Sequence, residues 1–166
     1  MLKFEFKISS AGAALARAKA VLVDMTPIMQ DVAEYVTEIT RQHFVDGKGP
    51  DGQPWAPKKP STLARYERLG YGNLDRVLIG PGKALSRQIV SEATPNAAIV
   101  GSSLIYSGVM QDGAEKGAFG KDRRGRPVPW GKIAAREWLY LTPKDEAEIV
   151  AIAEEHVADR LSSDTP

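Results

Sequence analysis

The stretch that decides the fold is residues 26–44, TPIMQDVAEYVTEITRQHF. Its apolar residues recur at steps of three and four, the spacing that places side chains on one face of a helix. They are Ile28, Val32, Tyr35, Val36 and Ile39. Thr26 and Pro27 favour a helix N-terminus, the first as a cap and the second in the first turn. The sequence therefore predicts a long helix that ends near Phe44 and supports the rest of the domain.

Patterns on both sides of this helix predict further elements. Residues 2–8 alternate apolar and charged side chains, as in a strand with one buried face, and the Ala-rich residues 11–23 predict a short helix. Downstream, residues 87–91 and 98–101 are extended segments on either side of the turn residues 94–96. They predict a hairpin.

The second half of the chain is less uniform. Residues 62–69 predict a short helix capped by Ser61, whereas residues 105–110 suit a helix or a strand equally well. Residues 136–141 predict a strand, and Thr142-Pro143 with two following carboxylates predicts the start of a last helix that runs to about residue 161.

These elements predict an α+β fold: a small, mainly antiparallel sheet packed with a long central helix and a C-terminal helix. We expect one domain over residues 1–161 and a flexible tail over residues 162–166. Two long Gly/Pro-rich loops interrupt it, residues 46–60 (the Trp55 loop) and residues 112–131 (the Trp130 loop). Loops of this length in a compact domain are commonly binding elements or locally disordered segments.

The composition excludes several classes of protein. The 166 residues include 22 Lys and Arg, 21 Asp and Glu, and no Cys, so the formal net charge is +1. A thiolate metal site, a disulfide scaffold and a Cys nucleophile are therefore ruled out. The apolar runs are shorter than the ~20 residues of a membrane-spanning helix, and the N-terminus lacks the apolar core of a secretory signal. We expect no membrane association.

Catalytic motifs are absent. The two histidines, His43 and His156, lie on predicted helix faces and are expected to be satisfied residues at the edge of the core. Residues 80–84, GPGKA, resemble a phosphate-binding loop, but Val77 stands where its first Gly is required and Ala84 where its Ser or Thr is required. We expect neither a cofactor nor a metal, and no enzymatic activity.

Charge is segregated along the chain. Residues 121–136 hold six basic side chains and one acidic side chain, and residues 137–166 hold two basic and eight acidic ones. The basic segment also contains Trp130, so it could neutralise phosphates and stack on a base. A nucleic-acid-binding module that uses residues 121–136 is therefore the alternative function.

Several sequence blocks resemble the phage virion morphogenesis family, which groups Mu-like morphogenesis proteins with tail completion proteins. The blocks stand in the family's order: Pro50-Asp51-Gly52 with Trp55-Ala56-Pro57 and Ser61-Thr62-Leu63, then Val77-Leu78-Ile79, Ala98–Ser102 with Tyr106, Gln111-Asp112-Gly113, and Ile133–Leu141. The chain departs from the family pattern at Met110, Asp112, Ala134, Glu137 and Tyr140. The resemblance covers most of residues 28–155.

This resemblance implies a structural protein of the virion, made in the host cytoplasm and placed at the neck or the head-proximal tail end. It implies a ring, for which we favour a hexamer, that contacts adjacent neck and tail-tube proteins. The predicted interface residues are Trp55, Tyr106, Gln111, Trp130 and Arg136. For Trp55 the alternative is that it pins its loop to the body of the domain, and for Arg136 it is a local ion pair with the acidic last helix.

The same resemblance implies a channel through which DNA passes without sequence-specific binding. Acidic residues of the long helix (Asp31, Glu34 and Glu38) or of the last helix would line it, because a negative wall neutralises no phosphates. Arg123, Arg124 and Arg126 are the residues that would face DNA or a partner protein instead.

Overall fold

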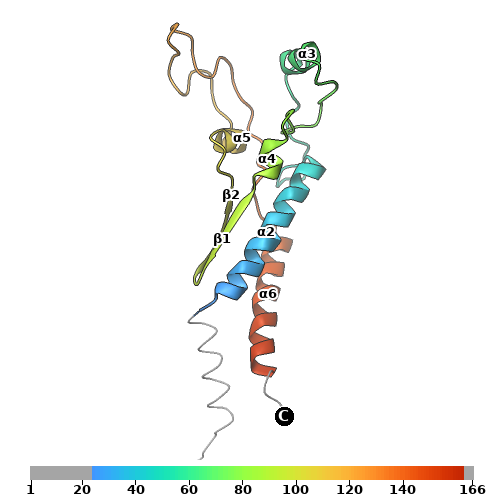
Figure 1. The fold of residues 1–166 in the computed structure, drawn as a ribbon, viewed down its shortest axis with the longest axis vertical. Helices are drawn as coiled ribbons and strands as arrows, with labels where there is room; N and C mark the ends of the chain where they lie inside the picture. Colours follow the sequence, from blue (N-terminus) through green and yellow to red (C-terminus); the bar gives the residue numbers. More distant parts are fainter. Residues whose placement is uncertain (1–23, 163–166) are drawn as a thin grey trace, which may run out of the picture. The chain divides into compact units, whose positions relative to one another are not determined.

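The computed structural model describes residues 24–162. They form five helices and one two-stranded sheet (Figure 1). The elements are α2 (Thr26–Asp46), α3 (Pro60–Arg68), α4 (Ala84–Arg87), β1 (Val90–Thr94), β2 (Ala97–Gly101), α5 (Ser107–Asp112) and α6 (Pro143–Ser162). The predicted α+β class with a small antiparallel sheet is confirmed. The predicted strand at residues 2–8 and helix at residues 11–23 lie outside the described residues.

The chain divides into two compact units, and the boundary falls inside α2, between Tyr35 and Val36. Among the described residues, the first unit contains residues 24–35, 92–99 and 143–162, and the second contains residues 36–91 and 100–142. The single domain expected over residues 1–161 stays a prediction.

In the first unit, α6 is bonded to the first half of α2. The Tyr35 hydroxyl donates a 2.8 Å hydrogen bond to Asp145, which is buried, and His156 contacts the Asp31 carboxylate at 2.6 Å. Partial burial and the Asp145 contact raise the pKa of Tyr35 to about 12. The apolar side of α2 here is buried at Ile28 and Val32.

The start of α2 corrects one expectation. Thr26 begins the helix, but the capping oxygen belongs to Asp24, whose carboxylate accepts bonds from the Thr26 main-chain N–H at 3.0 Å and from its hydroxyl at 2.5 Å. These bonds favour the ionised carboxylate and lower the pKa of Asp24. An Asp carboxylate accepts from a free main-chain N–H of a helix start as well as a Thr hydroxyl does, so Asp24 and not Thr26 supplies the side-chain acceptor here.

The second unit has a core of large apolar side chains from distant segments. They are Phe44, Trp55, Ile79, Leu85, Ile89 and Trp138. The ring of Phe44 lies 5.8 Å from each of the Trp55 and Trp138 rings, measured between centroids. The least exposed members of this group, at 3% each, are Phe44, Leu85 and Trp138, so these three lie at its centre. Most of this core therefore comes from loops and extended chain rather than from long helices.

Several element boundaries differ from those predicted. Residues 136–141 form no strand, because the main chain around Trp138 is bonded to the side chains of Gln111 and His43 instead of to a neighbouring strand. Helix α3 begins at Pro60, and Lys59, not Ser61, stands at its cap position. The one-turn helix α4 was not predicted. Of the two alternatives for residues 105–110, the helix is the one observed, as α5.

The Trp130 loop turns back on itself. Main-chain bonds join Phe119 to Val128, Asp122 to Arg126 and, at the base of the loop, Ala114 to Ile133 in both directions. The two arms of the loop are therefore held together along their length. No helix within residues 24–162 is long and apolar enough to cross a membrane.

Candidate assembly surface

Trp55 lies in the core of the second unit and has little surface for a neighbouring subunit. It is 6% exposed, and its indole N–H donates a 2.9 Å hydrogen bond to the Glu137 carbonyl oxygen. This geometry is the one expected if Trp55 pins its loop to the body of the domain, and not the one expected of an interface residue. The buried indole of Trp55 fills the space between Phe44 and the main chain at residue 137, so it is not free to contact another subunit.

Arg136 fixes the end of the same loop. Its guanidinium donates to the carbonyl oxygens of Ala56 at 2.8 Å, Pro57 at 3.1 Å and Ala134 at 3.2 Å. Burial lowers the pKa of Arg136. All three partners are main-chain oxygens, and not carboxylates of the acidic last helix, which were the local alternative predicted for Arg136. Arg136 therefore shapes the Trp55 loop.

Gln111 has a similar supporting role. Its side-chain oxygen accepts hydrogen bonds from the main-chain N–H groups of Trp138 at 2.9 Å and Leu139 at 3.1 Å. Its side-chain NH₂ donates to the Leu139 carbonyl at 2.9 Å. One amide thus satisfies three main-chain groups and sets the path of the chain that carries Trp138.

Both histidines have contacts of the kind expected of core-edge residues. His43 is 8% exposed, its Nδ1–H donates to the Trp138 carbonyl at 3.1 Å, and its ring stacks on Tyr140 at 3.8 Å. No group of three or more His, Cys, Asp or Glu side chains in the described part of the chain could hold a metal ion.

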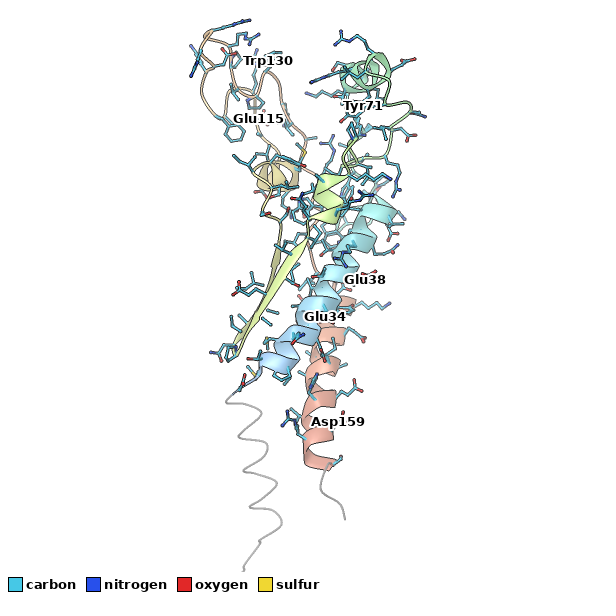
Figure 2. The ribbon with its side chains drawn as sticks, viewed as in Figure 1. Glu34, Glu38, Tyr71, Glu115, Trp130 and Asp159 are labelled. Atoms are coloured by element: carbon cyan, nitrogen blue, oxygen red, sulfur yellow. The ribbon has the colours of Figure 1, made fainter. Side chains whose placement is uncertain are left out.

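Trp130 and Tyr106, in contrast, are exposed. Trp130 is 65% and Tyr106 is 39% exposed, and Trp130 lies on the same loop as Glu115 (Figure 2). The Arg126 guanidinium lies 4.4 Å from the centre of the Trp130 ring and pairs with Asp122 at 2.7 Å. Hydrogen bonds from Arg126 and Arg124 lower the pKa of Asp122. Arg126 is thus held in place, while Arg123 and Arg124 present their side chains to solvent.

Further large apolar side chains are exposed in the second unit. Ile105, just before α5, is 97% exposed, and Phe119, on the Trp130 loop, is 58% exposed. Sequence periodicity could not single them out, because both lie outside regular elements. Large apolar side chains at the surface are candidates for contacts with another protein, because burying them removes apolar area from water.

The second unit also contains a cavity of about 690 Å³, which we call the basic groove. Apolar side chains line it, among them Leu78, Ile79, Leu85, Met110 and Ile133. Its charged lining consists of Lys58, Lys59, Lys83, Lys132 and Arg136. This site was not predicted from the sequence, although residues 80–84, which only partly match a phosphate-binding loop, form part of it.

The wall of the basic groove has an unusual backbone. Leu78 has φ 59° and Lys83 has φ 50°, and they are the non-glycine residues with positive φ in the described chain. Such a conformation costs on the order of 1–3 kcal/mol per residue and is concentrated at functional sites. Both residues line the groove.

Lys58 is the most enclosed lysine of the groove. Its ammonium donates to the carbonyl oxygens of Leu74 and Ile79, the second at 2.6 Å, and lies 5.0 Å from the centre of the Tyr66 ring. Burial lowers the pKa of Lys58, while the charge of Asp75 acts in the opposite direction.

Comparison with known proteins identifies the family. Residues 7–158 match the phage virion morphogenesis family. The chain is also similar to Mu-like prophage FluMu G protein 2 of Haemophilus influenzae, with 31% identity over 144 residues, which cover 87% of this chain and 84% of the relative. No solved structure is significantly similar. Since the family match extends over nearly the whole sequence, this chain belongs to the phage virion morphogenesis family.

Proposed function

We propose that this chain is a structural subunit of a tailed phage or prophage that acts in head–tail joining or tail completion. It works by assembling into a ring, with six subunits as the favoured number, at the neck or the head-proximal tail end. Membership of the virion morphogenesis family supports the structural role. In this proposal the chain has no catalytic activity and needs no cofactor.

The observation that carries the ring is the exposure of large apolar side chains beside a well-buried core. Trp138 is 3% exposed, whereas Trp130 is 65% and Ile105 is 97% exposed. Trp contributes strongly to binding energy where it becomes buried at an interface. Trp130 and Tyr106 therefore serve as contact residues. Gln111 and Arg136 have a supporting role instead, because Gln111 holds the chain that carries Trp138 and Arg136 holds the Trp55 loop.

Charge supports a passage for DNA. Glu34 and Glu38 are exposed on α2 (Figure 2), and Asp31 is exposed on the same helix beside His156. A channel wall with this charge lets the phosphate backbone pass, because it releases no counterions from DNA. Adjacent neck and tail-tube proteins are the remaining partners.

The test of the ring is the mass of the purified chain over a range of concentrations, measured by native mass spectrometry, with electron microscopy of the same sample. We expect closed oligomers of one size. Replacing Trp130 and Phe119 by Ala is expected to weaken assembly, and Val45→Ala, at an exposed residue of α2, is the control. A chain that remains monomeric at all concentrations contradicts the ring.

In a phage or prophage that encodes this chain, deletion of its gene is expected to leave heads and tails that do not join. The unaltered gene supplied in trans restores joined particles, and the Trp130→Ala/Phe119→Ala variant restores fewer. Normal particle yield without the chain would contradict the role in joining or completion.

A nucleic-acid-binding module is the second candidate. Exposed Arg123 and Arg124, next to Arg126 stacked on Trp130, form a surface that could bind phosphates and stack on a base. Retention of the purified chain on DNA that falls steeply with salt, and that Arg123→Ala/Arg124→Ala removes, favours this candidate. Retention that is absent at physiological salt favours the structural role.

A further inference from the structure

The basic groove has the charge of a binding site for an acidic partner. Its lining contains five cationic side chains and no carboxylate. Glu115 pairs with Lys132 at 2.6 Å, and the charge of Asp75 acts on Lys58. Lys59, Lys83 and Arg136 have no carboxylate partner among the described residues, so the groove keeps an excess of positive charge over an apolar floor.

The exposed face of α6 has the opposite charge. Val150 is 55% exposed, and Glu146 and Glu154 stand four residues before and after it. Residues at this spacing form one row along a helix. Neither carboxylate is part of an ion pair within residues 24–162. The small side chains of Ala147 and Ala151 beside the row leave room for close approach.

We propose, building on the ring proposed above, that the basic groove of one copy binds the Glu146–Val150–Glu154 row of α6 in the next copy. Val150 contacts the apolar floor, and the two carboxylates lie against the lysines and Arg136. Charge complementarity within one sequence selects a second copy of this chain as the occupant.

The size of the groove agrees with a contact of this kind. A turn of α-helix with its side chains occupies on the order of 500 Å³. The groove has a volume of about 690 Å³, so it receives the side chains of one or two turns rather than the 20 residues of α6. The row at residues 146–154 spans just over two turns.

The contact joins two different surfaces, so it is head-to-tail. In a bound pair, one copy still has an unoccupied groove and the other an unoccupied α6 face, and each can bind a further neighbour. A head-to-tail contact forms a closed ring where its rotation closes and a filament where it does not. The groove and α6 thus supply a repeated contact of the kind that a ring requires, in addition to the contacts that Trp130 and Tyr106 make.

Two full-length charge-reversal variants test the contact. The groove variant carries Lys59→Glu, Lys83→Glu and Lys132→Glu, so that acidic side chains outnumber Lys58 and Arg136 in the lining. The α6 variant carries Glu146→Lys and Glu154→Lys. Each alone places like charges together and is expected to lose at least ~10-fold in apparent association, measured by sedimentation. The matched control is Glu148→Lys with Glu155→Lys, which reverses two α6 carboxylates outside the row and is expected to assemble normally.

Mixing distinguishes a contact between copies from a contact within one chain. In a 1:1 mixture of the two variants, the groove of one variant meets an α6 row of opposite charge on the other. Assembly is therefore expected to return, with equal amounts of the two variants in each assembly. A chain that carries all five changes is also expected to assemble. Circular dichroism of each variant checks that it has folded.

The outcomes separate the two proposals. If the unaltered chain forms rings and both variants form them equally well, or if mixing restores nothing, the groove contact is wrong and the ring stands. If the variants abolish open head-to-tail oligomers but no closed ring is ever seen, the contact stands and the ring is wrong. If the unaltered chain stays monomeric at every concentration, both are wrong.

Discussion

Gln111 binds the main chain of Trp138, with the Gln111 side-chain oxygen 2.9 Å from the Trp138 nitrogen. The same oxygen accepts from the Leu139 N–H at 3.1 Å. This single side chain replaces the neighbouring strand that residues 136–141 would otherwise need. It thereby places the Trp138 indole in the core, where the indole N–H donates to the Ser107 carbonyl at 3.2 Å.

The first prediction concerns this amide. Gln111→Leu keeps a similar volume but leaves the main-chain groups of residues 138 and 139 without partners. Each unsatisfied buried group costs about 1–3 kcal/mol, so we expect the free energy of unfolding to fall by at least about 2 kcal/mol. Chemical denaturation measures it. Gln42→Leu, at an exposed Gln of α2, is the control, and an equal effect of both changes would contradict the role given to Gln111.

The second prediction separates two tryptophans. Trp138→Ala removes a 3%-exposed side chain from the centre of the core and is expected to cost about 3–5 kcal/mol. Trp130→Ala removes a 65%-exposed side chain and is expected to change stability by less than about 1 kcal/mol, since it loses only an exposed contact with Arg126. Thermal unfolding of both variants measures the difference. Similar losses would show that Trp130 is part of the fold and not of an interaction surface.

The parts of the fold that were predictable from sequence have local causes. Helices α2 and α6 follow from apolar spacing and from their start signals, and the hairpin from its turn at residues 94–96. The path of residues 136–141 depends on a side chain at position 111, far away in sequence, and a pattern within the segment cannot report it.

In the candidate site, too, features with local causes were predictable from the sequence, and features that depend on distant residues were not. Trp130 was predicted as an interface residue, and this role stays a prediction; its side chain is 65% exposed. Trp55, in an equally Gly/Pro-rich loop, is buried against Phe44, and composition cannot distinguish these two outcomes. The basic groove was missed because segments from α3, residues 78–85 and residues 132–136 meet there only in three dimensions.

The third prediction concerns Gly113, which follows α5. It has φ 74° and ψ −175°, a conformation that is essentially restricted to glycine. A Cβ at this position would lie 2.7 Å from both the Ala135 nitrogen and the Ile133 oxygen. These are main-chain atoms at the base of the Trp130 loop, so they cannot move aside cheaply.

Gly113→Ala is therefore expected to destabilise the fold by more than about 2 kcal/mol and to separate the base of the loop. The control is Gly120→Ala, where φ is also positive, +85°, but nothing lies within 4 Å of the added Cβ. Denaturation midpoints compare the two. If Gly120→Ala costs as much as Gly113→Ala, the cost comes from φ alone and not from the close approach at residues 133 and 135.

The fourth prediction is a pH dependence at Tyr35. Partial burial first, and then its hydrogen bond to Asp145, raise the pKa of this phenol from 10.0 to about 12. The folded state thus favours the neutral phenol. The resulting stabilisation is fully present below pH 10 and is lost as the pH rises from 10 through 12.

Tyr35→Phe is expected to lower stability near neutral pH, because it leaves Asp145 without this donor, and to make stability fall less steeply above pH 10. Denaturation at several pH values gives the slope. Tyr71→Phe, at a 50%-exposed residue, controls for the general loss of stability in alkali. Identical slopes for the unaltered chain and Tyr35→Phe would show that the phenol ionises equally easily in the folded and unfolded states, and that the contact between α2 and α6 does not depend on its proton.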